Sequence, residues 1–401
     1  MDRVLDVPFA DVIIVDDDPE VIEQLRTDLA HLDGAWTLRF CGSRDEAIAA
    51  LTVSAPDVVV SGVTSERDEQ DILDVVRVSI PSVGRIRLSD DGIDDAFRSV
   101  RSAHRVLDRP CRRGELAAAI EMIVRNRRQA PTDAIRDIVG AVDHLPSPGP
   151  IHHQLLQALE EDQGLDVLSE IVTQDVALTA EMLRLVNSSS FGLARTLSSV
   201  VDAISFLGVD VMTAMVAARS LFERTDGLAI DVDEVNRHSR GVASLAARSI
   251  VLAGEPSSMR SDAYVAGLLH DVGTLVLGQM ENVDGDEVRR ILSLDDALTE
   301  RMEFGADRFS VGEHLLGLWG FGESVAAAVR ELGEAIEDVE IGSAGWHVRV
   351  AHSTVLRGDV TPDAAMNDDD PDVGSAIETV DAELRELVSA TTALGLASAT
   401  S

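Results

Sequence analysis

The stretch LDVLSEIVTQDVALTAEMLRLVNSSSFGLARTLSSVVDAISFLG, residues 165–208, decides the fold of the larger part of this chain. Asp175 stands where a side chain can cap the start of a helix, because apolar residues recur after it at helical spacing. The apolar face of this expected helix consists of Leu178, Met182, Leu185 and Val186. The pattern predicts a short amphipathic helix that begins just after Asp175.

A second helix is predicted directly downstream. Ser198 or Ser199 can open it, and Gly208 stands where it would stop. Its apolar face consists of Val200, Ile204 and Leu207. Short amphipathic helices are marginal in isolation, so both are expected to pack into a larger all-helical body.

These residues resemble an HDOD domain, a helical output module of bacterial signalling proteins. The resemblance lies in Asp175, Leu178, the run LRLVNSS at 183–189 and the run AISFLG at 203–208. It implies an all-α domain over residues 143–395, related to the HD phosphohydrolases, that acts through protein–protein contacts. The segment from Ser375 to about Leu394 is expected to be its closing helix.

The charge of the chain limits its partners. Asp and Glu number 71 against 34 basic residues, all of which are Arg, and the net charge is −37. Such a charge opposes attachment to nucleic acid or to anionic lipid, so neither is expected as a partner. No apolar run approaches the roughly 20 residues of a membrane span, and the first residues lack the layout of a signal peptide. A cytoplasmic location is therefore expected.

Residues 9–128 alternate between strand and helix patterns. Short apolar runs predict strands, and amphipathic stretches lie between them, with a last helix from Gly114 to Val124. The expected strands are 12–15, 36–41, 57–61, 85–88 and 104–107. Alternation of this kind predicts a doubly wound, flavodoxin-like parallel sheet whose functional edge is the carboxyl end of its strands. Residues 129–142, which overlap the polar run RNRRQAPTD at 125–133, are expected to be a linker.

This first region resembles the receiver domain of response regulators. The matching runs are VDDDPEV at 15–21, PDVVVSGVT at 56–64 and RVLDRPCRRGEL at 105–116. The resemblance implies an acidic pocket containing Asp16, Asp17, Ser89 at the switch position and Arg109 where receivers carry lysine. At the position of the phosphoacceptor aspartate this chain has Gly62.

Gly62 argues against phosphorylation, because aspartyl phosphorylation needs a carboxylate nucleophile and glycine has no side chain. Asp57 lies at the start of its strand, well away from the pocket, and Asp68 lies in the following loop. Arg109 keeps a positive charge but differs from lysine in shape. We therefore expect a pseudo-receiver used for docking or dimerisation, without a phosphoacceptor. Two alternatives remain open for Asp16 and Asp17: they bind Mg²⁺ weakly, or they form a solvated acidic loop.

A second group of residues resembles the His-Asp signature of the HD superfamily. The run GLLHDVGTLVL at 267–277 supplies His270 and Asp271, and His238 fits the upstream position. His352 stands where an aspartate would be expected. These four residues could hold a transition metal that activates water. They could equally form a buried hydrogen-bonded network, and a two-metal site is disfavoured because Arg308 replaces a histidine of cyclic-dinucleotide-cleaving relatives.

The sequence thus favours a non-catalytic signal-transduction regulator with no catalytic residue. In it a pseudo-receiver is coupled to an HDOD output that contacts signalling proteins, and homodimerisation is open. One alternative is a metal-dependent HD-type phosphohydrolase acting on a nucleotide or cyclic dinucleotide. The other is a nucleotide sensor without turnover. No cofactor is required by the favoured interpretation, whereas the alternatives use the metal candidates His238, His270, Asp271 and His352.

Overall fold

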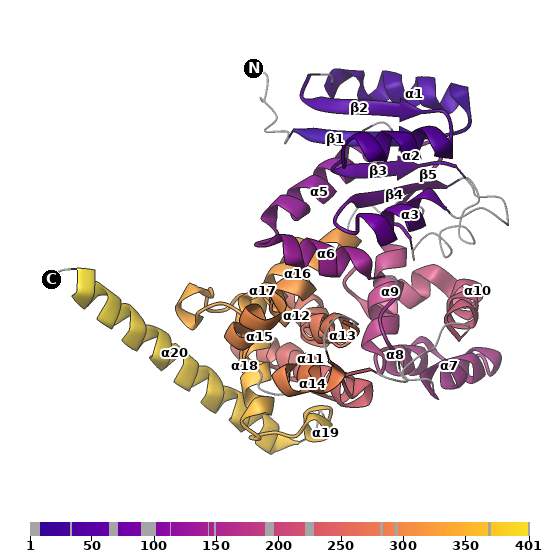
Figure 1. The fold of residues 1–401 in the computed structure, drawn as a ribbon. Helices are drawn as coiled ribbons and strands as arrows, with labels where there is room; N and C mark the ends of the chain where they lie inside the picture. Colours follow the sequence, from indigo (N-terminus) through magenta and orange to yellow (C-terminus); the bar gives the residue numbers. More distant parts are fainter. Residues whose placement is uncertain are drawn as a thin grey trace. The chain divides into compact units, whose positions relative to one another are not determined.

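The computed structural model of the chain forms two compact units, and each is described by itself. The first consists mainly of residues 1–144 and the second mainly of residues 145–401 (Figure 1). The structure describes residues 9–32, 34–63, 71–89, 102–112, 114–142, 144–147, 150–188, 196–220, 228–280, 284–292, 296–367 and 370–399.

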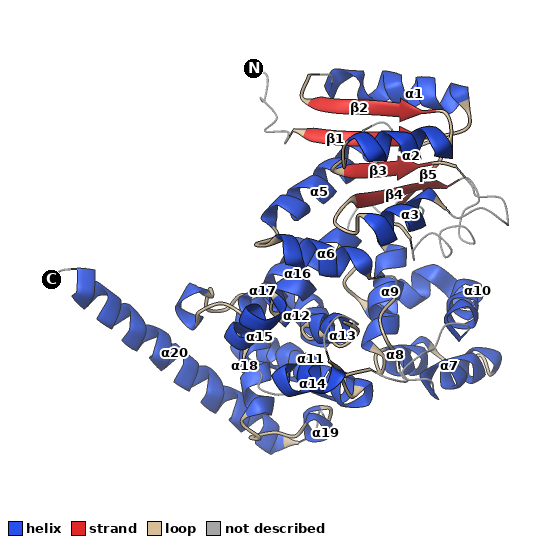
Figure 2. Ribbon diagram, viewed as in Figure 1, coloured by secondary structure: helices blue, strands red, loops and turns tan. Residues whose placement is uncertain are grey.

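The first unit contains a five-stranded parallel sheet (Figure 2). Its strands lie in the order β2-β1-β3-β4-β5, which is the flavodoxin-like order. In register, Val12 of β1 lies beside Leu38 of β2 and Val58 of β3. The strands are β1 Ala10–Val15, β2 Trp36–Cys41, β3 Val58–Ser61, β4 Gly84–Ser89 and β5 Arg105–Asp108. The predicted strands and fold class are confirmed.

Helices cover this sheet because its central strands β1 and β3 are near-continuous apolar runs, which must be buried on both faces. On one face, Ile13 and Val15 of β1 form a buried cluster with residues of α2 and α3. Asp18 caps α1 by accepting a hydrogen bond from the Glu20 amide, and Pro19 takes the first helical position. The helices are α1 Pro19–Leu29, η1 Ala30–Leu32, α2 Arg44–Val53, α3 Ile72–Ser79 and α5 Glu115–Gln129.

The stretch predicted as a linker contains a helix, α6 (Asp133–Ala141), capped by Thr132. The buried guanidinium of Arg85 donates to the Gly140 carbonyl at 2.8 Å. A side chain at Gly140 would collide with the Pro81 carbonyl, since a Cβ there would lie 1.9 Å from that oxygen. The linker prediction is corrected accordingly: residues 133–141 pack as part of the first unit.

The described part of the second unit is helical, as predicted. It also contains a 3₁₀ turn, η3 Ile336–Asp338. The longer helices are α7 Pro150–Glu160, α9 Val176–Val186, α10 Val200–Ser220, α11 Val232–Ala253, α12 Ser257–Leu269, α16 Arg308–Trp319, α18 Ala344–Leu356 and α20 Pro371–Ala399. The shorter helices are α8 Leu165–Val172, α13 Val272–Leu277, α14 Gly285–Leu292, α15 Ala297–Phe304, α17 Glu323–Glu331 and α19 Pro362–Ala365.

The stretch 165–208 folds as its pattern predicts. Asp175 is fully buried and accepts a hydrogen bond from the Leu178 amide at 3.0 Å, so it caps α9. Its other carboxylate oxygen accepts from the Ser147 hydroxyl. Asn236 of α11 accepts from the Val176 amide at 2.7 Å, which ties the start of α9 to the longest buried helix of the unit. The apolar faces of both predicted helices are buried.

Gly208 interrupts α10 rather than ending it. The residue has φ 74° and ψ 171°, a conformation that glycine adopts without steric cost, and the chain resumes a helix directly afterwards. The predicted stop is therefore confirmed as a break, and the further turns to Ser220 were not predicted. The predicted closing helix is α20, which begins and ends a few residues beyond the expected 375–394.

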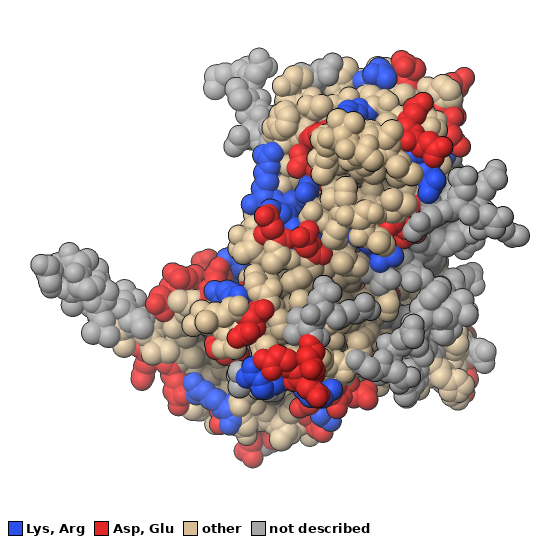
Figure 3. All heavy atoms as spheres, in the orientation of Figure 1, with Lys and Arg blue, Asp and Glu red and all other residues tan. Residues whose placement is uncertain are grey.

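Acidic side chains are scattered over the visible face of the molecule, with Arg between them (Figure 3). Among the described residues, no helix combines the length and the apolar character that crossing a membrane requires.

Candidate functional site

The carboxyl ends of β1, β3 and β5 meet at one edge of the sheet because the strands are parallel. This edge holds the receiver-like pocket, by which we mean Asp16, Gly62, Ser89 and Arg109. Asp16 is fully buried, and both of its oxygens have donors: Oδ1 accepts from the Asp18 amide at 2.9 Å and Oδ2 from Arg109 Nη1 at 2.7 Å. Two of the predicted pocket residues, Asp16 and Arg109, therefore meet as an internal ion pair.

Gly62 leaves the room that this ion pair occupies. A Cβ at residue 62 would lie 1.9 Å from Asp16 Oδ2 and 2.9 Å from Arg109 Nη1. Both distances are below any real van der Waals contact, so even alanine would force one of these side chains to move. At the position of the phosphoacceptor in receivers, this chain thus has no side chain, and the ion pair leaves no space for one.

The other candidates of this pocket contribute less. Asp17 is exposed, and Ser89 is buried with no hydrogen-bond partner for its Oγ in the described structure. Asp57 lies at the opposite end of β3, where it accepts from the Asp11 amide and pairs with Arg127. Asp68 lies outside the described residues.

These residues do not fit Mg²⁺. The ion prefers an octahedron of oxygen ligands, usually including one or two carboxylates. Asp16 has no free oxygen facing the pocket, the Arg109 guanidinium already supplies the positive charge, and Gly62 supplies no ligand. A bound Mg²⁺ would have to displace Arg109 from a carboxylate that is 0% exposed.

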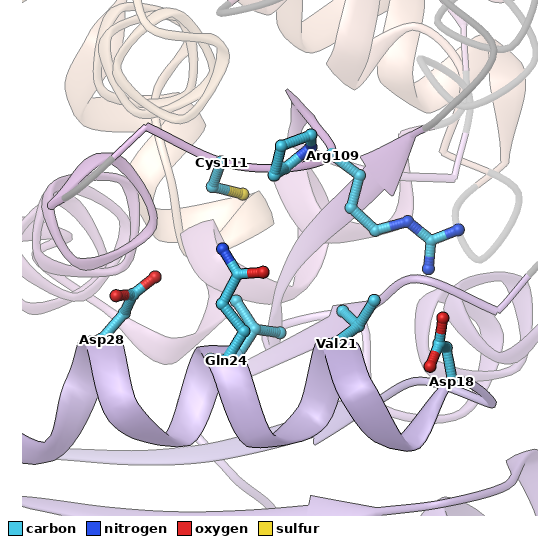
Figure 4. Close-up of a pocket in the computed structure, with 8 residues that line it drawn as sticks. Asp18, Val21, Gln24, Asp28, Arg109 and Cys111 are labelled. Atoms are coloured by element: carbon cyan, nitrogen blue, oxygen red, sulfur yellow. The ribbon is translucent and has the colours of Figure 1, made fainter.

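A small cavity of about 200 Å³ lies beside this ion pair, between α1 and the end of β5 (Figure 4). Asp18, Gln24, Asp28, Arg109 and Cys111 are among its lining residues, and Arg109 extends toward the end of α1 that carries Asp18. Burial, with the carboxylates of acidic neighbours, raises the pKa of Cys111 to about 12. Its thiol stays protonated at neutral pH, so it is not a nucleophile.

Three imidazoles converge in the helical unit. His238 lies on α11, His270 ends α12 and His352 lies on α18. Their ring centroids are 5.0–5.3 Å apart, and one nitrogen from each lies within 4.8 Å of the others. We call these three residues the histidine cluster.

Glycine brings two of these helices together. A Cβ at Gly267, one turn before His270, would lie 2.8 Å from the Ala243 Cα of α11. Only a residue without a side chain allows α12 to approach α11 this closely. The close approach places His270 beside His238.

His270 presents an unsatisfied nitrogen to the cluster. Its Nδ1 hydrogen-bonds the Gly267 carbonyl at 2.6 Å, so Nδ1 carries the proton and Nε2 carries a lone pair. Nε2 is buried and has no hydrogen-bond partner in the described structure. Burial lowers the pKa of His270 and of His352 to about 3, with further lowering by the neighbouring imidazoles. Both rings are neutral at physiological pH, the form that binds metal.

Asp271 was predicted to join these histidines, and its Oδ1 has contacts of its own. This oxygen accepts from the Thr274 hydroxyl and lies 3.8 Å from Arg308 Nη1, and Asp271 is outside the group of three converging nitrogens. Burial acts to raise the pKa of Asp271, but the charge of Arg308 and neighbouring groups outweigh it and lower the pKa to about 2. The structure thus brings together three of the four predicted candidate ligands, and Asp271 stays a candidate beside them.

Arg308 is fixed by groups that the sequence did not indicate. Its Nε donates to Glu300 Oε1 at 2.6 Å, and its Nη2 donates to the Leu292 carbonyl at 2.7 Å. Gly273 lets the backbone of Arg308 approach α13, because a Cβ there would lie 1.8 Å from the Arg308 carbonyl. The only sequence signal for this arrangement was Arg308 itself, at a position where cyclic-dinucleotide-cleaving relatives carry histidine.

Comparison with known proteins bears on the helical unit. Residues 145–334 match the family model of the HDOD domain, the family that this part of the sequence resembles, and they lie within the predicted bounds of 143–395. A stretch of 149 residues is 28% identical to an uncharacterized protein of Treponema pallidum (strain Nichols). That match covers 36% of this chain but 28% of the relative, less than a third of its length.

Two solved structures are similar over larger parts of the chain. The MmoQ response regulator of Methylococcus capsulatus is 23% identical, with a TM-score of 0.48, and the match covers 61% of this chain and 98% of that one. An HDOD domain protein of unknown function from Geobacter sulfurreducens is 24% identical, with a TM-score of 0.34, covering 64% and 95%.

Proposed function

We propose that the chain is a non-catalytic signalling regulator in which an unphosphorylated receiver-like unit is coupled to an HDOD domain that contacts other proteins. The observation that carries this proposal is the Asp16–Arg109 ion pair packed against Gly62. Phosphoryl transfer to a receiver needs a nucleophilic carboxylate and a metal-binding pocket, and this pocket has neither.

The described part of the receiver-like unit is a folded scaffold. Its five strands form one parallel sheet, and β1, β3 and β4 are almost entirely buried. A unit that keeps its fold but not its chemistry can still act by binding a partner. Its effect on the HDOD domain would then come from a difference in partner affinity between two states of the chain.

The expected partner is a protein. A net charge of −37 disfavours phosphate backbones and anionic lipid surfaces, since each contact would bring like charges together. Both units would therefore work by protein–protein contacts, either with other signalling proteins or with a second copy of this chain.

Exposure to acetyl phosphate and Mg²⁺, followed by intact-mass measurement and peptide mapping, tests the proposal. We expect no Mg²⁺-dependent phosphorylation of the full chain. A phosphoryl group mapped to Asp16, Asp17 or Asp68 would overturn the assignment of a pseudo-receiver, because each is an acid near the pocket or its adjoining loop.

A second candidate is an HD-type phosphohydrolase acting on a nucleotide or cyclic dinucleotide, and the histidine cluster is the observation that favours it. A metal held there would supply activation of water. Against it, Asp271 is engaged by Arg308 and His352 replaces an expected carboxylate. Turnover of cyclic dinucleotides by chain loaded with Zn²⁺, Mn²⁺ or Fe²⁺, lost in His270→Ala, would establish this alternative. We expect no turnover.

A further inference from the structure

We propose that the C-terminal part of α20, residues 387–399, pairs with the same segment of a second copy of this chain. We call this part of the helix the α20 tip. The proposed function leaves the choice between another signalling protein and a second copy open, and pairing through the tip goes beyond it. The pairing involves neither the receiver-like pocket nor the histidine cluster, so it can fail while the proposed function stands.

A stripe of apolar side chains fixes α20 to its unit. Apolar residues recur along this helix at alternating intervals of four and three residues, which keeps them on one side. We call this stripe the seam. Its first four residues are 1–7% exposed, and α20 packs there against α11 and α18. These four residues are Val373, Ile377, Val380 and Leu384.

The seam continues past the helices that bury it. Leu387, the next seam residue, is 49% exposed, whereas Leu384, one turn earlier, is 7% exposed. The backbone stays helical to Ala399, and in the sequence the same spacing goes on to Thr391 and Leu394. Figure 1 shows this end of α20 apart from the other helices of its unit. The tip is about 20 Å long at a rise of about 1.5 Å per residue.

The tip carries no charge. From Leu387 to the last residue the sequence contains no Asp, Glu or Arg, whereas residues 371–386 of the same helix contain five acids and one Arg. In a chain of net charge −37, most surfaces of two copies repel each other. At the tip, two copies come into contact without bringing like charges together.

The absence of charge also disfavours other partners. A helix that lies on a lipid surface usually carries Lys or Arg on its polar side, and the tip has neither. In coiled coils, charged residues that flank the seam select the partner. Here the flanking residues are uncharged, so nothing in them discriminates against an identical helix. They are Val388, Ala390, Gly395 and Ala397.

Two tips of identical spacing can pair about a twofold axis, so that each copy makes the same contacts. The paired seam would be short, since stable coiled coils sustain the pattern over at least three or four heptads. We therefore expect a weak, reversible dimer whose formation follows mass action.

Sedimentation velocity of the full chain tests the pairing, at protein concentrations from about 1 to about 200 µM. We expect the mass to rise from that of one chain, 42.9 kDa, towards twice that value. Leu387→Asp should weaken the association at least about tenfold, because it places like charges opposite each other in the seam. Leu387 is already half exposed, so the variant should keep its fold, which circular dichroism checks.

Ser389→Asp is the matched control. It adds the same charge at an exposed position about 200° around the helix from Leu387. This variant should dimerise within about threefold of the wild-type dissociation constant. Amide exchange of residues 387–399 should also slow as the concentration of the wild type rises, which locates the contact in the tip.

Three results would overturn the proposal. The wild type could stay a monomer over the whole range, Leu387→Asp could dimerise as the wild type does, or Ser389→Asp could lose association as fully as Leu387→Asp. A monomer that floats with uncharged phosphatidylcholine vesicles would assign the tip to a lipid surface instead. None of these results bears on phosphorylation of the receiver-like unit, which acetyl phosphate tests separately.

Discussion

The receiver-like pocket and the histidine cluster are both buried polar groups at positions where their families do chemistry, yet they are satisfied differently. In the pocket, each oxygen of Asp16 has a donor within the chain, and a guanidinium supplies the positive charge. In the cluster, Nε2 of His270 has no partner in the described structure. A buried carboxylate whose two oxygens both have donors has little to gain from a metal ion, whereas an imidazole nitrogen with no donor can gain from one.

This difference also explains the roles of two substitutions relative to the families that the units resemble. Arg109 stands for lysine and reaches Asp16 across the space that Gly62 leaves free. Arg308 stands for histidine, is held by Glu300 and lies 3.8 Å from Asp271 Oδ1, while the three imidazoles converge nearby. An arginine thus closes one site, whereas at the other it lies beside a candidate carboxylate.

The largest expected effect comes from opening the closed pocket. Arg109→Ala leaves the fully buried Asp16 without its countercharge, so we expect a loss of about 3–5 kcal/mol in the stability of the receiver-like unit. Urea-dependent amide exchange of β1 and β3 measures this unit by itself. The Asp16→Ala, Arg109→Ala double variant should lose less than the sum of the single losses. Strict additivity would show that the ion pair does not hold the pocket closed.

Removing a metal should affect only the helical unit. An ion present at a hundredfold excess over its dissociation constant stabilises the folded state by about 2.7 kcal/mol. A chelator should therefore lower the thermal stability of the wild type and leave His270→Ala unchanged. Equal shifts in the two proteins would place the stabilising ion somewhere other than the histidine cluster.

Gly62→Ala tests whether the receiver-like pocket has space for one additional carbon atom beside the Asp16–Arg109 ion pair. Its Cβ would overlap Asp16 Oδ2, so we expect a loss of about 1–3 kcal/mol from overpacking. Gly42→Ala is the matched control in the same unit, because a Cβ there would meet only Glu46 Oε2 at 3.6 Å. If both variants unfold at the same denaturant concentration as the wild type, the pocket has room that the structure does not show.

The smallest expected effect concerns Glu313 of the helical unit, whose charge Arg330 neutralises only in part. Burial raises the pKa of Glu313 to about 7, and acidic neighbours add to this although Arg330 lies 3.2 Å away. The folded state therefore holds this proton more tightly than the unfolded state does. The stability it contributes is complete below the ordinary glutamate pKa of about 4.5 and is lost as the pH rises through about 7.

Glu313→Gln should consequently stabilise the protein at pH 8 relative to the wild type, and the gain should shrink toward pH 5. Thermal unfolding at the two pH values measures it, with the exposed Glu340→Gln as control. A gain of the same size at both pH values would mean that ionisation of Glu313 is not its source.

The sequence predicted the elements that carry both sites. Alternating apolar runs located the five strands, and the residues after them located the pocket, because parallel strands place their carboxyl ends at one edge. Helical spacing and Asp175 located α9, whose cap the structure bears out. Strong periodicity and capping chemistry are local properties, and local properties can be read from sequence.

The contacts that decide the chemistry are not local. Asp16 and Arg109 are far apart in the chain, and nothing in either neighbourhood says that one side chain would fill the space left by Gly62. Asp271 follows His270 directly and was expected to share its metal, but nothing near it in the sequence says that its Oδ1 would face Arg308, which Glu300 holds. The helix α6 was missed because it begins at the end of the polar run at 125–133 and because one of its contacts comes from Arg85, which is distant in the sequence.

The central claim is that the receiver-like pocket binds no metal ion whereas the histidine cluster can bind one. Calorimetric titration of the chelator-treated chain with Zn²⁺, and separately with Mg²⁺, tests this claim most directly. We predict one Zn²⁺ per chain, lost in His270→Ala and kept in Asp16→Ala, and no binding of Mg²⁺. Mg²⁺ binding that disappears in Asp16→Ala, or Zn²⁺ binding that is unchanged in His270→Ala, would contradict the account.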